Sequence, residues 1–195
     1  LSGGNATRFG IFSLVYGIHG TYWMPVYEEN APPVLVTALD AAGFELRVIS
    51  SARMSYPEFR STAWVTMQDR VEDDFPQGEK YERDRAVVDR FEHFLDDRDA
   101  RGEQAPFFCF TLLDAPHQTY SWPPEETLFE PAPRSLDYLN LSSRPDDATI
   151  ASVRNSYDNA VHFSDANARR MIDALARHGA LENTFVVVTG DHGEE

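Results

Sequence analysis

The run VVVTGDHGEE, from Val186 to Glu195, joins the pattern of a buried strand to a polar turn. Three β-branched valines favour an extended strand, and the glycine and polar residues after them favour a turn. Asp191 and His192 are therefore expected side by side, directly after a strand. A carboxylate and a neutral imidazole on one turn can both bind a divalent ion, and this mixed donor pair suits zinc or manganese. By itself, the Asp-His-Gly triplet fits a purely structural turn equally well.

Upstream of this run, helical and strand patterns alternate along the chain. The order is α-β-α-β-α-β, which predicts a mainly parallel sheet with helices on both of its faces. Glycines end two of the helical patterns, at Gly43 and Gly179. The predicted elements are a helix from Pro33 to Gly43, a strand at Phe44–Ser50, a helix at Lys80–Arg101, a strand at Phe107–Leu113, a helix from Asp146 or Asp147 to about His178, and a strand at Thr184–Thr189.

Apolar spacing predicts which side of each helix is buried. The expected inward residues of the first helix are Val34, Leu35, Ala38, Leu39 and Ala42. Those of the second are Val87, Val88, Phe91, Phe94 and Leu95. Those of the third are Val153, Tyr157, Ala160, Val161, Ala168, Met171, Ile172 and Leu175. The strand Phe107–Leu113 is apolar enough to be buried on both faces. Asp69–Gly78 is an expected surface loop, and the long proline-rich stretch Ala115–Pro145 is typical of a functional loop.

Composition excludes several classes of protein. The chain has 195 residues, of which 42% are apolar, and its net charge is −15, with 32 acidic and 17 basic residues. Nucleic acid is excluded as a ligand because phosphate binding needs a basic face. The single cysteine, Cys109, excludes an internal disulfide. The sequence begins in what reads as the middle of a loop and stops directly after the Asp-His-Gly turn, so we expect residues 1–195 to form one catalytic domain that is truncated at both ends.

Three polar clusters lie at or near the predicted strand ends, where parallel α/β sheets bind their ligands. The first is Asp191 with His192. The second is Asp114-Ala115-Pro116-His117, which follows the strand Phe107–Leu113. The third is the opening loop, Gly3-Gly4-Asn5-Ala6-Thr7-Arg8.

These clusters carry a resemblance to a known family. The ending Thr-Gly-Asp-His-Gly-Glu-Glu resembles the metal motif of the sulfatase and alkaline-phosphatase superfamily, and Asp114 to His117 resembles that superfamily's Pro-His loop. The segment from Asn155 to Val161, with Asp165, is similar to its long helix before the last core strand. The opening segment, Asn5 to Gly17, is most similar to the sulfatase-like proteins of the bacterial inner membrane, of the YejM/PbgA type. Lipoteichoic acid synthases and phosphoethanolamine transferases are more distant members of that branch.

The resemblance implies an alkaline-phosphatase-like three-layer α/β sandwich and a metal-dependent hydrolase or transferase of sulfate or phosphate esters. It implies that Thr7 is the nucleophile and shares a divalent ion (Zn, Mn, Mg or Ca) with Asp191 and His192. It implies that His117 meets the non-bridging oxygens or the leaving group; its plain alternative is a hydrogen-bonded loop histidine. Arg8 and Asn5 are the expected substrate-binding residues, although Arg8 also fits an ordinary surface arginine.

Two departures from the family pattern narrow the expected chemistry. The chain has no Cys-x-Pro-x-Arg motif, so strict sulfatase chemistry through formylglycine is disfavoured. The family also uses an upstream carboxylate and downstream histidines, which we expect outside residues 1–195. The resemblance further implies a location at the periplasmic face of the inner membrane, attachment only through a segment outside this chain, and a substrate that includes a lipid head group. The alternative is a catalytically silent domain that binds or regulates in the control of envelope lipids.

Overall fold

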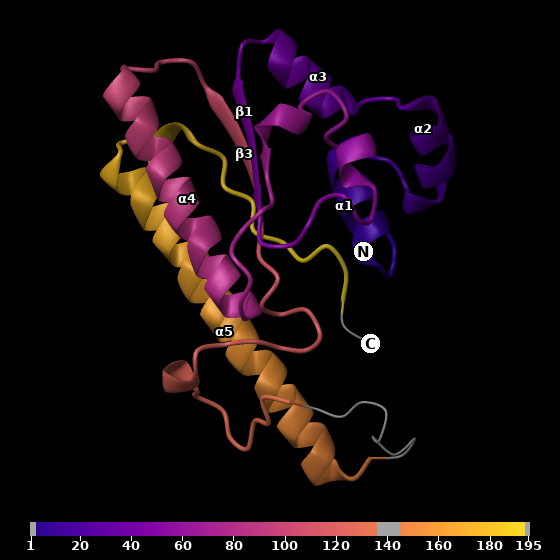
Figure 1. The fold of residues 1–195 in the computed structure, drawn as a ribbon, viewed down its shortest axis with the longest axis vertical. Helices are drawn as coiled ribbons and strands as arrows, with labels where there is room; N and C mark the ends of the chain where they lie inside the picture. Colours follow the sequence, from indigo (N-terminus) through magenta and orange to yellow (C-terminus); the bar gives the residue numbers. More distant parts are fainter. Residues whose placement is uncertain (1–2, 136–144, 194–195) are drawn as a thin grey trace. The chain divides into compact units, whose positions relative to one another are not determined.

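The computed structural model describes residues 3–135 and 145–193, which form two compact units (Figure 1). We call them the sheet unit and the helix unit. The sheet unit comprises Leu1–Asp74, Arg101–Thr111 and Phe185–Glu195, and the helix unit comprises Phe75–Ala100 and Leu112–Thr184. Each unit has its own buried residues. The expectation of a single catalytic domain stays a prediction.

Five α-helices and three β-strands occur in the described residues, in alternating order. The helices are α1 (Thr7–Tyr16), α2 (Trp23–Glu29), α3 (Val34–Ala41), α4 (Lys80–Arg101) and α5 (Asp147–Arg177). The strands are β1 (Glu45–Ser50), β2 (Val71–Glu72) and β3 (Phe107–Leu112). Short 3₁₀ turns are η1 (Gly20–Tyr22), η2 (Phe59–Ser61), η3 (Gln68–Arg70), η4 (Pro124–Glu126) and η5 (Leu181–Asn183).

The sheet unit is built on a small parallel sheet with strand order β2-β1-β3. Strands β1 and β2 are parallel, with Val48 opposite Val71 and Ile49 opposite Glu72. Strand β3 runs in the same direction on the other side of β1 (Figure 1). Val48 and Ile49 are fully buried because β1 is the central strand. The predicted α/β class and parallel sheet are confirmed, and so are the strands predicted at Phe44–Ser50 and Phe107–Leu113.

The strand predicted at Thr184–Thr189 is wrong, because this segment lies outside any sheet in the described structure. Phe185 is fully exposed, and Val187 and Val188 are 76% and 72% exposed. Valines satisfy the local preference of a strand, but a strand forms only when a neighbour takes up its backbone N–H and C=O groups. Within residues 3–135 and 145–193, no strand does so. The prediction that β3 is buried on both faces is also wrong, since all of its residues are only partly buried.

The predicted bounds of the helices agree closely with the observed ones. Helix α4 has the predicted bounds, and its predicted apolar side is buried. Helix α5 begins after Asp146, whose side chain accepts a hydrogen bond of 2.8 Å from the Thr149 N–H and so caps the helix. Inward residues are less well predicted: in α3 only Val36 is buried, while Val34 and Leu35 are exposed. In α5, Ala160 and Leu175 are buried as predicted, but Val161 is exposed.

The buried side of α5 differs from the prediction because it also carries polar residues, which hold the long loop. The Asn159 Oδ1 accepts hydrogen bonds from the N–H groups of Leu128 and Phe129, at 2.8 and 3.0 Å. Its Nδ2 donates to the Phe129 carbonyl at 2.9 Å. Asn155 and Ser156 donate to the carbonyls of Pro131 and Pro133. The predicted loop is therefore tied to α5 over its described part, and residues 136–144 of that prediction lie outside the described residues.

The acidic stretch predicted as a surface loop contains β2 and one buried carboxylate. Asp73 is 6% exposed and accepts hydrogen bonds from the Met54 N–H at 2.6 Å and from Arg60 at 2.7 Å. Burial opposes the charge of Asp73, but the hydrogen bonds from Arg60 and Met54 outweigh it and lower the pKa of this carboxyl. In the described parts of the chain, no helix has the length and apolar character needed to cross a bilayer.

Candidate active site

Two residues separated by nearly the whole chain meet in the sheet unit. The Thr7 hydroxyl oxygen lies 3.3 Å from Nε2 of His192, although the residues are 185 positions apart. Thr7 is the first residue of α1, and His192 lies in the turn after the extended segment at 184–190. The predicted proximity of Thr7 to His192 is confirmed, whereas its proximity to the Asp191 side chain and the roles of these residues stay predictions.

The hydrogen bonds around His192 define which ring nitrogen is protonated. Its Nδ1 lies 2.7 Å from the Gly193 carbonyl oxygen, which can only accept, so Nδ1 carries the proton of the neutral ring. In the neutral ring, the Nε2 lone pair then accepts a hydrogen bond from the Thr7 hydroxyl. One oxygen of the Asp191 carboxylate accepts a hydrogen bond of 3.0 Å from the backbone N–H of His192, and the other oxygen lies 3.7 Å from Nε2. The lone pair aimed at Thr7 is therefore available to a proton or to a metal ion.

A glycine in α1 makes this meeting possible. A Cβ atom added to Gly10 would lie 2.1 Å from the Asp191 carbonyl oxygen, closer than any real contact. The backbone of Asp191 therefore rests directly on α1, one helical turn after Thr7. A glycine inside a helix normally costs about 1 kcal/mol relative to alanine. Here, its missing side chain is what lets the turn approach the helix.

The first turn of α1 has backbone N–H groups near Thr7 that no carbonyl within the helix accepts. Ala6 precedes the helix and provides no side-chain cap. The first N–H groups of a helix have no intrahelical acceptor, and with the helix dipole they favour an anion. Asn5 is exposed just before this end, in a position compatible with its predicted contact to substrate.

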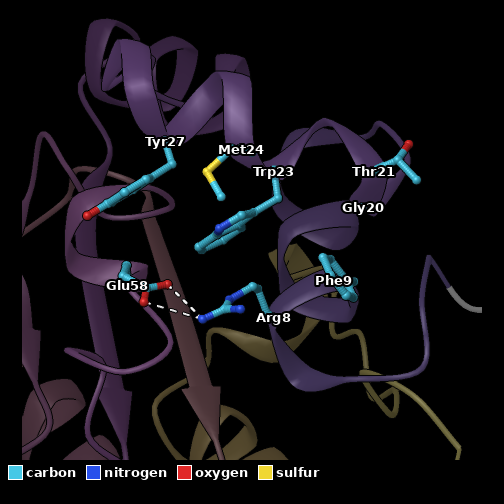
Figure 2. A pocket seen from close by; sticks show the side chains of 8 residues that line it. All are labelled: Arg8, Phe9, Gly20, Thr21, Trp23, Met24, Tyr27 and Glu58. Carbon is cyan, nitrogen blue, oxygen red and sulfur yellow. Dashed lines mark hydrogen bonds and ion pairs between the residues drawn. The ribbon is translucent and has the colours of Figure 1, made fainter.

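Arg8 lies beside Thr7 and borders a pocket of about 360 Å³ (Figure 2). Its terminal nitrogen donates to both carboxylate oxygens of Glu58, at 3.1 and 3.3 Å. The guanidinium also stacks on Trp23 and Tyr56, 5.5 and 5.9 Å from the ring centroids. Arg8 is thus a positioned side chain, and its anion-binding role stays a prediction. The pocket is lined by Arg8, Phe9, Gly20, Thr21, Trp23, Met24, Tyr27 and Glu58.

The Pro-His loop belongs to the helix unit. The buried carboxylate of Asp84 accepts the N–H groups of Asp114 and Ala115, both at 2.8 Å, and so fixes the start of the loop. The His117 Nδ1 lies 2.6 Å from the Gln118 carbonyl oxygen and 3.2 Å from Lys80 Nζ. Lys80 donates to the carbonyls of His117 and Gln118. The position of His117 relative to Thr7 stays a prediction, because these residues belong to different units.

The donor atoms around Thr7 fit part of a metal site. Two ligands of one tetrahedral ion, each roughly 2 Å from it, lie roughly 3.3 Å apart. The separations of His192 Nε2 from Thr7 and from Asp191, 3.3 and 3.7 Å, are close to that value. Across the described residues, no group of three or more His, Cys, Asp or Glu side chains could hold an ion. The site thus offers one hydroxyl, one carboxylate and one imidazole, which fits an incomplete ligand set.

Sequence reasoning missed four residues that shape these sites. Gly10 had a visible signal, since it interrupts an apolar helical run. Asp84, on the charged helix α4, could have been noticed as an acid on its apolar side. Glu58 and Trp23 had no signal, because their roles depend on how η2 and α2 pack beside α1.

Comparison with known proteins identifies the family of this chain. The family described as Sulfatase matches residues 2–195. The inner membrane protein YejM of Salmonella typhimurium (strain LT2) is 25% identical over 193 residues, which are 99% of this chain and 27% of that protein. The YejM protein of Salmonella typhi gives the same identity and coverage. The chain therefore spans about a quarter of the length of these relatives. The match over its whole length shows that the chain belongs to the sulfatase family.

Proposed function

We propose that this chain carries the nucleophile of a metal-dependent hydrolase or transferase that acts on phosphate or sulfate esters. The observation that carries the proposal is the 3.3 Å approach of the Thr7 hydroxyl to Nε2 of His192. A threonine is a weak nucleophile until a base or a metal takes its proton. Thr7 and His192, which are 185 positions apart, meet at the N-terminus of a helix, and such a position favours anions.

In the proposed reaction, the Thr7 oxygen attacks phosphorus or sulfur and the bond to the leaving alcohol breaks. Water or an acceptor alcohol then attacks the resulting ester and regenerates Thr7. Thr7, Asp191 and His192 would hold the divalent ion, with further ligands from outside residues 1–195. The chemistry such an ion supplies is loss of the hydroxyl proton near neutral pH.

Arg8 is the proposed clamp for the anionic ester. Its ion pair with Glu58 has both side chains about one third exposed, at 32% and 31%, and pairs of this kind contribute about 1 kcal/mol or less. A phosphate or sulfate presents two or three oxygens to the same guanidinium and binds it more strongly. Arg8 can therefore leave Glu58 for a substrate at small cost. Asn5 and His117 are proposed to contact the same ester.

The proposed place of action is the periplasmic face of the bacterial inner membrane, with a lipid head group in the substrate. The relatives that match this chain are inner membrane proteins by name. Attachment to the membrane is proposed to come from a segment outside this chain.

Metal binding tests the proposal without relying on activity. Isothermal titration with zinc and with manganese should show weak binding to residues 1–195, because three donors make a poor set. A full-length protein with the implied upstream carboxylate and downstream histidines should bind at least tenfold more tightly. Asp191→Ala should remove binding from both, whereas Asp165→Ala, an exposed aspartate on α5, should not.

Two outcomes would contradict this account. Tight binding by residues 1–195 that survives Asp191→Ala would place the metal elsewhere. Equally weak binding by both proteins, with no hydrolysis of phosphate or sulfate esters, would instead favour the silent, regulatory alternative.

A further inference from the structure

Arg8, the proposed clamp for the ester, already binds a carboxylate of the chain itself. Its Nη2 donates to both carboxylate oxygens of Glu58, at 3.1 and 3.3 Å. A carboxylate that uses a guanidinium fully accepts parallel hydrogen bonds from two nitrogens. Here one nitrogen serves both oxygens, and the buried Nε of Arg8 has no hydrogen-bond partner within residues 3–135 and 145–193. The pair is therefore incomplete, and the guanidinium keeps donors that Glu58 does not use.

Both members of this pair are held by the same aromatic side chain. The guanidinium of Arg8 lies over the Trp23 ring, 5.5 Å from its centroid. Phe59, which follows Glu58, is 2% exposed and meets the same ring edge-on, with centroids 6.1 Å apart. The Glu58 carbonyl oxygen also accepts a hydrogen bond of 3.1 Å from the Ser61 N–H. The carboxylate of Glu58 is therefore positioned beside Arg8 by the fold of the sheet unit.

The pocket beside Arg8 has no excess of positive charge. Among the described residues that line it, Arg8 and Glu58 carry charges of opposite sign and the others are uncharged. Figure 2 shows this pair on one side of the Trp23 ring and Met24 on the other. The lining is therefore neutral before any ester binds, in a chain whose net charge is −15. One negative charge on an ester can pair with Arg8, whereas a second would find no cation in this lining.

We propose that Glu58 is a specificity-determining residue, which makes the site favour esters that carry a single negative charge. This role rests on the proposed function, because it needs an ester at Arg8. Such an ester lies within roughly 6 Å of the Glu58 carboxylate, a range in which like charges repel each other strongly. A phosphate monoester carries about two negative charges at pH values well above about 6. It is therefore repelled about twice as strongly as a phosphodiester or a sulfate monoester, each of which carries one charge.

Steady-state kinetics of the full-length protein with a divalent metal test the proposal. At about pH 8, 4-nitrophenyl phosphate carries about two charges, whereas bis(4-nitrophenyl) phosphate and 4-nitrophenyl sulfate carry one. All of these esters release 4-nitrophenolate, and comparing a variant with the wild type on the same ester cancels the ester's own reactivity. Glu58→Gln should raise kcat/KM for the monoester about tenfold more than for either singly charged ester, because the second charge meets the same repulsion again.

Two variants serve as controls. Glu72→Gln also neutralises a carboxylate of the sheet unit that lies 3.1 Å from an arginine, and the two glutamates are similarly exposed, at 29% and 31%. It should leave the ratio between the esters unchanged, which separates the local charge from the net charge of the chain. Glu58→Asp keeps the charge and should shift the ratio far less than Glu58→Gln. Circular dichroism of each variant should match the wild type, since both glutamates are partly exposed.

Anion binding separates a failure of this role from a failure of the proposed function. Methyl phosphate and methyl sulfate have the same shape but differ by one charge, so isothermal titration measures the preference without turnover. Glu58→Gln should gain about tenfold more affinity for methyl phosphate than for methyl sulfate. If no ester is hydrolysed, the proposed function fails, and this binding ratio alone decides the role of Glu58.

Three results would overturn the proposal. One is a Glu58→Gln protein in which kcat/KM for every ester, or the affinity for both methyl anions, changes by the same factor. Another is an equal shift of the ratio in Glu72→Gln, which would assign the effect to the net charge of the chain. The third is a protein that neither hydrolyses any of the esters nor binds either methyl anion. Turnover of the diester alone, or of the sulfate ester alone, supports the proposal and identifies which singly charged ester is the substrate.

Discussion

The close approach of Gly10 to the Asp191 backbone gives a sharp prediction. In Gly10→Ala, the new Cβ atom would stand 2.1 Å from the Asp191 carbonyl oxygen, whereas ordinary contact begins at 3.4 Å. The turn must therefore move by about 1.3 Å, the difference between these two distances. The Thr7–His192 separation is already 3.3 Å, so such a move takes it beyond hydrogen-bond range. Misplacement by about 1 Å costs roughly 100-fold in rate, and we expect that loss of ester hydrolysis in the full-length protein.

The same variant can be checked without turnover. Nitrogen-15 NMR of the His192 ring should show Nδ1 protonated in the wild type, and the hydrogen bond at Nε2 should be lost in Gly10→Ala. The matched control is Gly193→Ala, whose Cβ would meet nothing within 4 Å. Overall stability should change little, because a gain of about 1 kcal/mol in helix propensity offsets a similar overpacking cost. A Gly10→Ala protein with the wild-type ring spectrum and rate would refute the reasoning.

Two further predictions concern stability. Asp73→Asn should lower the free energy of unfolding by about 2 kcal/mol at neutral pH, because a buried carboxylate with charged hydrogen bonds is lost; exposed Asp74→Asn is the control. The folded-state pKa of Asp73 is lowered, so its stabilisation is complete above the ordinary aspartate pKa of 3.8 and is lost as the pH falls through the lower folded pKa. Urea unfolding should show the two proteins converging below about pH 4, and a constant difference down to pH 2 would contradict this. Asn159→Ala should cost about 2 kcal/mol and speed proteolysis in the loop at 115–135, because three hydrogen bonds are lost, whereas Asn155→Ala, which loses one, should have a much smaller effect. Equal effects of the two variants would show that Asn159 does not anchor the loop.

Local patterns predicted the regular elements because those elements depend on local sequence. The apolar spacing of α4, the Asp146 cap of α5 and the strand runs of β1 and β3 all act over a few residues. The segment at 184–189 has an equally clear strand pattern, but pairing depends on a partner strand. The described residues provide none, so the pattern alone could not predict its state. The two-residue strand β2 is too short to leave a pattern.

The candidate site likewise has a part that motifs predicted and a part that depends on tertiary contacts. The meeting of Thr7 and His192 was predictable because two motifs, at opposite ends of the chain, resemble one family's metal site. Gly10 and Glu58 act through tertiary contacts, on the Asp191 backbone and on Arg8, and no motif includes them. The inward asparagine of α5 was missed because spacing arguments count apolar residues, and Asn159 is buried for its hydrogen bonds.

The most direct test of the central claim is to trap the covalent ester on Thr7. The full-length protein would be mixed with 4-nitrophenyl phosphate or 4-nitrophenyl sulfate and a divalent metal, quenched in acid, digested and analysed by mass spectrometry. The account predicts that the peptide containing Thr7 gains the mass of one phosphoryl or sulfuryl group, and that Thr7→Ala abolishes both this adduct and turnover. Turnover that persists in Thr7→Ala, or an adduct on any other residue, would contradict it.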